Sequence, residues 1–286
     1  MKLVIDFVKY QGCGNDFIII DELDHEIVPE ELKGAVSRII CKRRFSVGAD
    51  DVLYLLPSNK AHAWMRIFEP DGTEADMCGN GIRCAASYLC EKLRKNSVLI
   101  ETKAGAKLIK KIDGYFKVDM GRLLRKLYEL KDFVSVEFEE EEDLIGRRVS
   151  FPLVGELEIS IVKVGEPHAV IFVEDVEKED MEEYAKAIAM NKKFFPKGIS
   201  VNLVQIVSEN TIKVRTYERG VWGETLACGT GSTASAAVAY ILGKVKDKKI
   251  KVKVRGGELT ILVEGNALYL IGPAQKVFDG RIEINV

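Results

Sequence analysis

A short sequence phrase occurs twice in this chain and constrains its fold more than any other feature. Met77-Cys78-Gly79-Asn80-Gly81 returns 150 residues later as Ala227-Cys228-Gly229-Thr230-Gly231. Each phrase opens an alanine-rich apolar run, 82–93 after the first and 233–242 after the second. Such a run predicts a helix whose first N–H groups are unpaired and carry partial positive charge. We therefore expect a lowered pKa for the cysteine at each helix start.

The duplication extends beyond the two cysteines. Three further segments have counterparts in the second half, in the same order and at offsets close to 150. They pair Arg66-Ile67-Phe68-Glu69 with Arg215-Thr216-Tyr217-Glu218, Gly14-Asn15-Asp16-Phe17 with Gly165-Glu166-Pro167-His168, and 48–53 with 199–204, which aligns Asp51 with Asn202. Agreement of four segments in order and spacing indicates two homologous domains related by a pseudo-two-fold axis.

Strand patterns outnumber helix patterns along the chain. Many short runs of β-forming residues lie between turn residues, and helical spacing appears at 29–41, at 181–189 and in the two runs that follow the cysteines. These patterns predict the α+β class, with a strand-rich, barrel-like sheet wrapped around a central helix in each domain.

Charge and hydropathy narrow the functional classes. A net charge of −2 over 286 residues argues against a nucleic-acid partner. No apolar stretch reaches the roughly 18 residues of a membrane span, and no signal peptide is recognised, so we expect a cytoplasmic protein. In that compartment the six cysteines are not expected to form a disulfide framework.

The remaining cysteines do not suggest a metal site. Cys78, Cys84 and Cys90 recur every six residues, so on a helix they do not share a face. The chain has only three histidines and no CxxC spacing, and we expect no metal. Cys41, Cys84 and Cys90 are interpreted as small buried side chains. Packing is also favoured for Cys13, although its glycine-rich loop could reach the site.

Two thiols at matched helix starts can act on opposite faces of one substrate. An amino-acid α-carboxylate held between two helix N-termini would accept hydrogen bonds from their first N–H groups. One cysteine as thiolate would remove the Cα proton, and the other as thiol would return a proton from the opposite side. The chain has no phosphate-binding loop and no GxGxxG pattern after a strand, so we expect no cofactor.

Several motifs together resemble the diaminopimelate epimerase family, from about residue 5 to the C-terminus. They are Gly12-Cys13-Gly14-Asn15-Asp16-Phe17, Arg66-Ile67-Phe68, Asp71-Gly72-Thr73-Glu74, 77–84, Pro167-His168, Tyr217-Glu218-Arg219-Gly220 and 223–231. The resemblance implies an isomerase that interconverts LL- and meso-diaminopimelate without pyridoxal phosphate, in lysine and cell-wall precursor biosynthesis. It also implies a homodimer.

The resemblance further implies a domain division and a site. One domain would comprise residues 1–118 and 272–286, the other 119–271, with the active site in the cleft between them. Cys78 and Cys228 would be the acid–base pair. The implied substrate-binding positions are Asn15, Asp51, Glu69, Gly79, Asn80, Glu166, His168, Asn202, Glu218, Arg219, Gly229 and Thr230.

Three of these positions depart from the family pattern. Glu69 and Glu166 stand where the family has asparagine, and Asp51 stands where many members have glutamine or glycine. Two extra carboxylates at the distal end of the substrate would favour an ammonium there and disfavour a carboxylate. A racemase of a basic amino acid, lysine or ornithine, is therefore the alternative. If the glutamates instead pair with Arg219 or Arg66, diaminopimelate still fits, and we favour it.

Two other functions are weaker alternatives. A proline-racemase-like enzyme would also use two cysteines, but the motifs around Asn15 and Glu218 fit it poorly. A non-catalytic amino-acid-binding protein could keep the cleft without needing both thiols.

Overall fold

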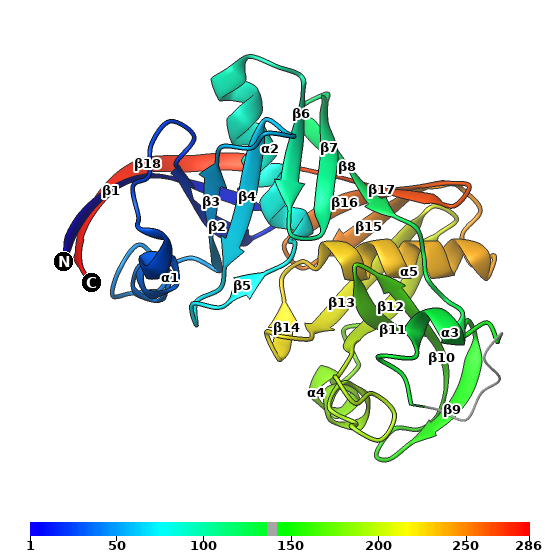
Figure 1. Cartoon of the computed structure of the whole chain (residues 1–286). Coiled ribbons are helices and arrows are strands. Elements are labelled where there is room, and N and C mark those ends of the chain that lie inside the picture. Colours follow the sequence, from blue (N-terminus) through cyan, green and yellow to red (C-terminus); the bar gives the residue numbers. More distant parts are fainter. Residues whose placement is uncertain (136–141) are drawn as a thin grey trace. The chain divides into compact units, whose positions relative to one another are not determined.

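The chain separates into two compact units that repeat one order of strands and helices (Figure 1). Unit 1 comprises residues 1–119 and 272–286, and unit 2 comprises residues 120–271. The structure is a computed structural model that describes residues 1–135 and 142–286.

Unit 1 is built mainly from strands joined by short turns. Its strands are β1 (Lys2–Gly12), β2 (Asn15–Asp21), β3 (Asp51–Leu56), β4 (Ala63–Phe68), β5 (Glu74–Ala75), β6 (Ser97–Thr102), β7 (Gly105–Ile112), β8 (Tyr115–Gly121, which ends in unit 2) and β18 (Gln275–Asn285). Its helices are η1 (Glu30–Leu32), α1 (Lys33–Ile40) and α2 (Gly79–Leu93). β2 is parallel to β3 and β4 to β6, whereas the pairs β1–β2, β3–β4, β4–β5, β6–β7 and β7–β8 are antiparallel.

Unit 2 repeats this order. Its strands are β9 (Arg147–Phe151), β10 (Gly155–Val164), β11 (Glu166–Phe172), β12 (Ser200–Ser208), β13 (Thr211–Glu218), β14 (Gly223–Thr225), β15 (Lys249–Val254), β16 (Gly257–Glu264) and β17 (Ala267–Gly272). Its helices are α3 (Leu127–Leu130), α4 (Met181–Tyr184), the π-helical turn η2 (Ala185–Ala189) and α5 (Gly229–Ile241). The parallel pairs are β11–β12 and β13–β15, at the places that β2–β3 and β4–β6 hold in unit 1.

One helix in each unit is surrounded by that unit's strands. α2 packs against β1, β2, β3, β4, β6, β7 and β18, and α5 against β10, β11, β12, β13, β15 and β16. Close contact with strands on several sides favours small side chains, which agrees with the alanine, glycine and serine content of both runs. The predicted α+β class with a central helix in each half is confirmed.

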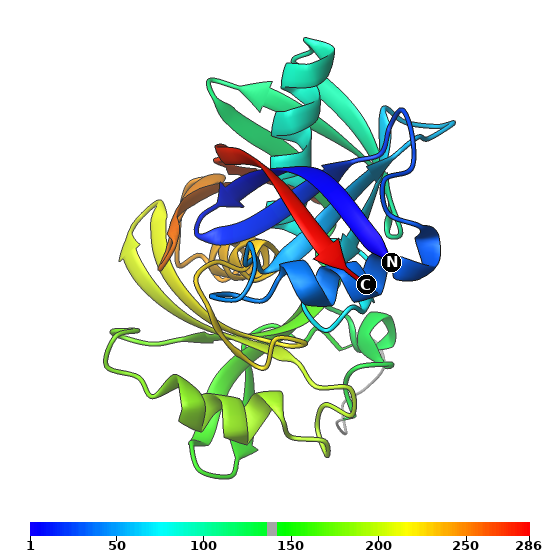
Figure 2. The same ribbon diagram turned by 90° about the vertical axis from the view of Figure 1, so that its left-hand side faces the viewer.

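β1 and β18 form a long antiparallel ribbon within unit 1 (Figure 2). Their register runs from the Lys2–Asn285 pair to the Gln11–Gln275 pair, with an irregularity between Lys9 and Tyr10. The backbone N-terminus also donates a hydrogen bond to the carbonyl oxygen of Val286. The two chain ends therefore lie side by side in unit 1.

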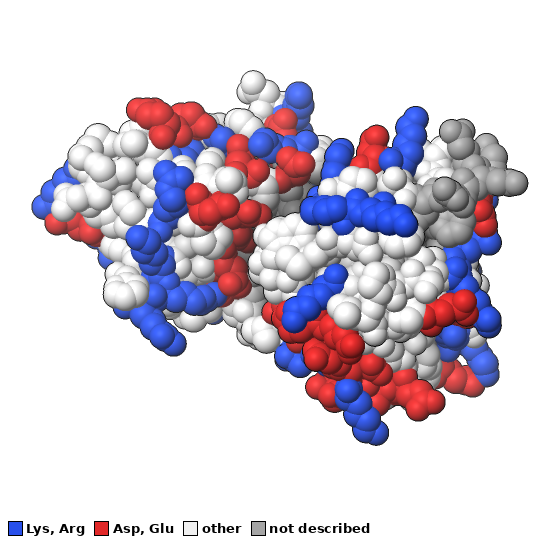
Figure 3. Space-filling view, turned by 90° about the horizontal axis from the view of Figure 1, so that it is seen from below, with Lys and Arg blue, Asp and Glu red and all other residues white. Residues whose placement is uncertain are grey.

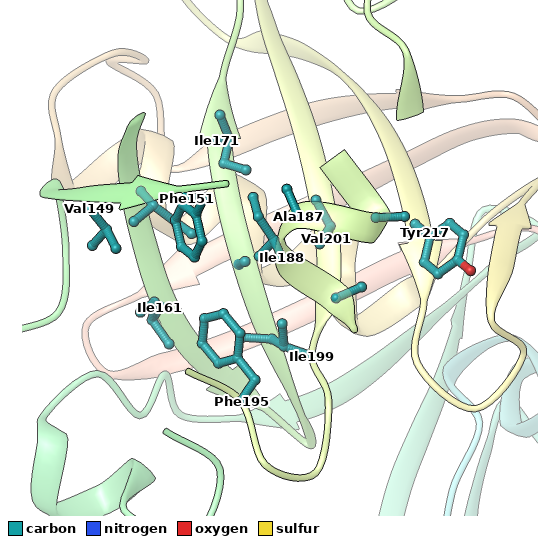
Figure 4. Close-up of a cluster of buried hydrophobic side chains, with 14 of the residues drawn as sticks. Val149, Phe151, Ile161, Ile171, Ala187, Ile188, Phe195, Ile199, Val201 and Tyr217 are labelled. Carbon is teal, nitrogen blue, oxygen red and sulfur yellow. The ribbon is translucent and has the colours of Figure 1, made fainter. Parts of the chain in front are cut away.

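Each unit has its own hydrophobic core. In unit 2, aliphatic side chains from β9, β10, β11 and β12 pack under α4 and η2 together with Phe151 and Phe195 (Figure 4). In unit 1, Ile5, Ile18, Ile20 and Val52 belong to a cluster with Val36 and Ile40 of α1. Full burial of each such side chain contributes roughly 1.5–3 kcal/mol to folding, so the core of each unit stabilises that unit.

Surface charge is mixed on the face in Figure 3, where Lys and Arg side chains lie among Asp and Glu side chains. Within residues 1–135 and 142–286, none of the helices combines the length and apolar character needed to cross a membrane.

Some elements were not expected from the sequence. The strand patterns recognised in the sequence did not include β9 or β18, and α3 lies outside the runs with helical spacing. By contrast, both central helices start at the glycine after the cysteine, so each cysteine lies at a helix start as predicted.

Candidate active site

Both cysteines of the duplicated phrase cap a central helix. Cys78 precedes α2 with an extended backbone, and its Sγ accepts a hydrogen bond from the Gly81 N–H at 3.4 Å. Cys228 precedes α5 in the same conformation, and its Sγ accepts from the Gly231 N–H, also at 3.4 Å. Each sulfur therefore lies at the positive end of a helix, where a thiolate is stabilised.

Asn15 is the main polar neighbour of Cys78. The Cys78 thiol lies 3.8 Å from Asn15 Oδ1, which also accepts a hydrogen bond of 3.1 Å from Asn80 Nδ2. The amide nitrogen of Asn15 donates to Asp50 Oδ2 at 2.7 Å. These bonds fix which end of the Asn15 amide faces the thiol.

A tight hairpin turn brings Asn15 to this place. Gly12 pairs with Asn15 across the β1–β2 ladder, so only Cys13 and Gly14 form the loop. Both loop residues have positive φ, 55° for Cys13 and 81° for Gly14, as a two-residue turn between twisted strands requires. Cys13 is buried, which agrees with the packing role favoured from the sequence.

Cys228 has a more acidic neighbourhood. Its Sγ lies 3.4 Å from Thr230 Oγ1, and the Glu218 carboxylate interacts with the same thiol. Thr225 Oγ1 donates to Glu218 Oε2 at 2.9 Å. Burial of the thiol, followed by the charge of Glu218, raises the pKa of Cys228 well above its ordinary value. The expectation of a lowered pKa is therefore wrong for Cys228, because desolvation and a nearby anion outweigh the helix N-terminus.

His168 and Asn202 form a buried pair below the start of α5. Asn202 Nδ2 lies 3.2 Å from His168 Nδ1 and donates to the Ala169 carbonyl at 3.1 Å. Asn202 Oδ1 accepts from Thr216 Oγ1 at 2.9 Å. Both side chains are fully buried, and burial lowers the pKa of His168 to about 3, so the imidazole is neutral near pH 7.

Replacing His168 with phenylalanine should weaken the acid sensitivity of folding. In an unfolded chain histidine titrates near pH 6.5, whereas the native pKa of His168 is about 3. Between these values the unfolded state binds more protons, so this group lowers stability as pH falls below about 6.5, by about 2–3 kcal/mol at pH 4.5. Urea unfolding at pH 7.5 and 4.5 measures the difference. An equal loss of stability in both proteins would contradict the assignment.

Phenylalanine is a suitable replacement for His168 because the equivalent position of unit 1 is a phenylalanine, Phe17. Phe17 pairs with Asp51 as His168 pairs with Ser200. The same register corrects the alignment made from the sequence. The counterpart of Asp51 is Ser200, and the counterpart of Asn202 is Leu53, so that alignment was two residues out.

The two unexpected glutamates have protein partners. Glu166, at the exposed start of β11, forms an ion pair with the Arg219 guanidinium. The backbone N–H of Arg219 donates to Ser200 Oγ at 3.0 Å. Glu69 accepts a hydrogen bond of 3.1 Å from Thr73 Oγ1. Arg219 therefore balances the charge of Glu166, whereas the contact of Glu69 is with a neutral hydroxyl that also donates to Asp71 Oδ1 at 2.6 Å.

Arg66 does not take part in balancing these charges. It pairs with Glu74, with Arg66 Nε 2.7 Å from Glu74 Oε1, and Arg215 repeats this pair with Glu224 at 2.7 Å in unit 2. The guanidinium of each pair is largely buried, and its glutamate lies in the short strand that precedes the capping cysteine.

The candidate residues fall into local groups inside each unit. Around Cys78 the structure gathers Asn15, Gly79 and Asn80, while Asp51 starts β3 beside Phe17 and Glu69 follows β4. In unit 2, Glu218 and Thr230 contact Cys228 and are joined at the helix start by Gly229, while His168 contacts Asn202 and Glu166 contacts Arg219.

Sequence reasoning missed four polar residues that hold these groups. Asp50 orients Asn15, Thr216 orients Asn202, Thr225 binds Glu218, and Arg83 binds the first turn of α2. Asp50 and Thr216 lie within the repeated segments of the sequence, close along the chain to predicted site residues. That closeness was the sequence signal that could have identified them. Among residues 1–135 and 142–286, no cluster of three or more His, Cys, Asp or Glu side chains could hold a metal ion.

Known proteins match the chain along its length. A family model for diaminopimelate epimerase matches residues 7–125 and 160–277. The diaminopimelate epimerase of Methanocella arvoryzae is 44% identical over 283 residues, covering 98% of this chain and 98% of that protein. The diaminopimelate epimerase of Methanocaldococcus jannaschii is 39% identical over 296 residues, covering 99% of each.

Solved structures share the fold at low sequence identity. A PhzF-family phenazine biosynthesis protein of Bacillus anthracis has a TM-score of 0.66 at 20% identity and covers 99% of both chains. A hydroxyproline epimerase of Agrobacterium vitis has a TM-score of 0.67 at 14% identity, covering 99% of this chain and 92% of its own. These likenesses concern the fold alone. The family model and the full-length relatives show that this chain belongs to the diaminopimelate epimerase family of isomerases.

Proposed function

We propose that this protein interconverts LL- and meso-diaminopimelate by proton transfer at Cα, with the thiols of Cys78 and Cys228 as the acid–base pair. One observation carries the proposal: the same N-cap cysteine, with its sulfur accepting the N–H three residues later, occurs in both units. Inversion at carbon needs one group to remove a proton and another to deliver one to the opposite face. Family membership supports diaminopimelate as the substrate.

The N–H groups at the two helix starts would bind the α-carboxylate. Gly79 and Asn80 begin α2, and Gly229 and Thr230 begin α5. Loss of the Cα proton moves negative charge onto this carboxylate. Fixed backbone donors stabilise that charge without reorganising, which lowers the barrier. No cofactor is required for these steps.

The other predicted site residues would orient the substrate around the two thiols. Asn15 and Glu218 contact the capping cysteines, and Arg219 is the cation proposed to receive the distal carboxylate. Asp51, Glu69, Glu166, His168 and Asn202 complete the proposed set. Because Asn202 and His168 are fully buried, we propose that they act by positioning the residues around them.

The ion pair of Glu166 with Arg219 supports diaminopimelate over lysine or ornithine. An unbalanced Glu166 would attract a distal ammonium, but here its charge is already neutralised within the protein. Thr73 gives Glu69 a hydrogen bond but no opposite charge. The ion pair of Glu166 therefore weakens the case for a racemase of basic amino acids, and Glu69 is the one residue that still favours it.

We further propose two epimerase domains, one of residues 1–118 with 272–286 and the other of residues 119–271, with the site in the cleft between them. The enzyme is proposed to act as a homodimer in the cytoplasm. Its proposed role is in lysine and cell-wall precursor biosynthesis. Exposed apolar side chains on the β1–β18 ribbon, Val4, Val277 and Phe278, support a protein partner there. Sedimentation of the purified protein measures the oligomeric state.

Chiral analysis of reaction mixtures tests the function. The protein is incubated separately with LL-diaminopimelate, L-lysine and L-ornithine, under a thiol reductant. We expect LL-diaminopimelate to approach its equilibrium mixture with the meso isomer, and the other two amino acids to remain enantiomerically pure. Rapid racemisation of lysine without turnover of diaminopimelate would overturn the proposal.

A further inference from the structure

Arg83 is a fully buried arginine on the first turns of α2. Its guanidinium donates from Nη1 to the Gly79 carbonyl at 2.9 Å, from Nη2 to Asn80 Oδ1 at 3.0 Å and from Nε to the Pro273 carbonyl at 3.2 Å. All three acceptors are neutral oxygens. A buried charge without a carboxylate partner is costly, so its presence calls for a physical reason.

Thiols are the ionisable groups around this cation. Burial lowers the pKa of Arg83, and the thiols of Cys13, Cys84 and Cys78 counteract part of that shift. Cys84 lies on α2 itself, and Cys13 lies in the β1–β2 turn. Asp50, which Arg43 neutralises in part, accepts a hydrogen bond from the Asn15 amide that contacts Cys78.

The surrounding backbone is shaped to admit the guanidinium. A Cβ atom added to Gly12 would lie 3.3 Å from Arg83 Nη2 and 3.3 Å from the Pro273 oxygen. A side chain there would push into the bonds that hold the cation. The cavity for Arg83 therefore depends on a glycine next to the Cys13 turn.

Unit 2 shows that this place in the helix does not need a charge. Thr233 is the fifth residue after Cys228, as Arg83 is the fifth after Cys78, and its Oγ1 donates to the Gly229 carbonyl at 2.8 Å. A neutral hydroxyl thus satisfies the carbonyl that matches Gly79. The charged neighbour of the thiol in unit 2 is instead Glu218, an anion.

We propose that Arg83 makes the two thiols unequal, so that the free enzyme rests with Cys78 as thiolate and Cys228 as thiol. This inference rests on the proposed two-thiol function. Cys78 then removes the Cα proton of the isomer whose Cα–H bond points toward Cys78. Cys228 delivers its own proton to the opposite face of Cα. The enzyme is left with Cys78 as thiol and Cys228 as thiolate. Transfer of one proton from Cys78 to Cys228 through solvent restores the resting form. Arg83 is a positioning residue, acting on Cys78 through charge and on Asn80 through its hydrogen bond.

Alkylation by iodoacetamide tests the inference on the full-length protein without substrate. The rate is followed across pH for each cysteine separately, by the mass of its proteolytic peptide. The pH midpoint reports ionisation, whereas steric access of the reagent to the sulfur changes only the absolute rate. We expect the Cys78 midpoint to lie at least about one pH unit below that of Cys228, since a nearby opposite charge shifts an ionisation by about 1–3 units. Coincident or reversed midpoints in the wild-type protein overturn the inference.

Variants isolate the contribution of the charge. Arg83→Met should raise the pH midpoint of Cys78 alkylation by about one unit or more. The acidic limb of the pH profile of kcat/KM should move to higher pH by the same amount. Arg83→Lys keeps the positive charge and should retain most of the wild-type behaviour. Thr233→Val is the matched control and should leave the Cys78 midpoint unchanged. An unshifted midpoint in Arg83→Met would refute the role of the charge.

The outcomes separate this inference from the proposed function. If diaminopimelate is turned over and the midpoints coincide, only the inequality of the thiols fails. If the midpoints differ as expected but diaminopimelate is not turned over, the proposed substrate fails while the effect of Arg83 on Cys78 stands.

Discussion

Cys78→Ala and Cys228→Ala should each lower diaminopimelate epimerisation by about a thousandfold or more, because each removes one of the two proposed acid–base groups. Chiral chromatography of the product measures the loss. Each variant keeps one thiol, so it should still exchange the α-proton of one isomer with deuterated solvent without inverting it. The two variants should retain exchange with opposite isomers.

Cys90→Ala is the matched control for the cysteine variants. Cys90 is a buried cysteine on the same helix that Cys78 caps, but it lies about three turns away. We expect its activity to stay within about twofold of wild type. Full epimerase activity in Cys78→Ala or Cys228→Ala would remove that cysteine from the mechanism.

Gly231→Ala is expected to have the second largest effect. The added Cβ atom would lie 2.3 Å from Asn202 Oδ1 and 3.3 Å from both Cys228 Sγ and Thr216 Oγ1. Asn202 is fully buried and hydrogen-bonded at both ends of its amide, so it cannot yield without breaking a bond. We expect a loss of stability of about 1–3 kcal/mol and a loss of kcat of about a hundredfold, measured by urea unfolding and by initial rates.

The equivalent change in unit 1 provides the comparison. A Cβ atom on Gly81 would meet Leu53 Cδ2 and Phe17 Cε1, each at 3.3 Å. These are apolar contacts that relax by a few tenths of an ångström. Gly81→Ala should therefore cost less than about 1 kcal/mol. Equal penalties for the two alanine variants would show that the Asn202 amide is not the cause.

The limits of the sequence-based alignment have a geometric origin. Segments 48–53 and 199–204 were aligned two residues away from the register that the strands adopt. Side chains along a strand alternate with a period of two, so a shift of two residues leaves every side chain on the same face. The apolar pattern is therefore equally good in both alignments, and only the partner strand distinguishes them.

β18 illustrates a similar limit. β18 was missed because its side chains are mostly exposed and carry no clear apolar alternation. Its partner β1 holds it in place, and that pairing is a long-range property.

The position of the two thiols at helix starts was predictable from the sequence, but the electrostatics around them was not. The duplicated cysteine phrase identified both N-cap thiols from residue types and spacing alone. The raised pKa of Cys228 arises from burial and from Glu218, a residue ten positions away that the β13–β14 hairpin brings close. The burial of Arg83 likewise depends on Gly12 and Pro273 from distant parts of the chain.

The β1–β18 ribbon has a consequence for biosynthesis on the ribosome. Residues 2–7 of β1 have their ladder partners at 280–285, which are translated after all of unit 2. Unit 2 is a continuous segment and can complete its core while unit 1 still lacks a strand. During that interval the outer part of β1 exposes an unpaired strand edge, the kind of surface that chaperones protect and that nascent chains use to aggregate.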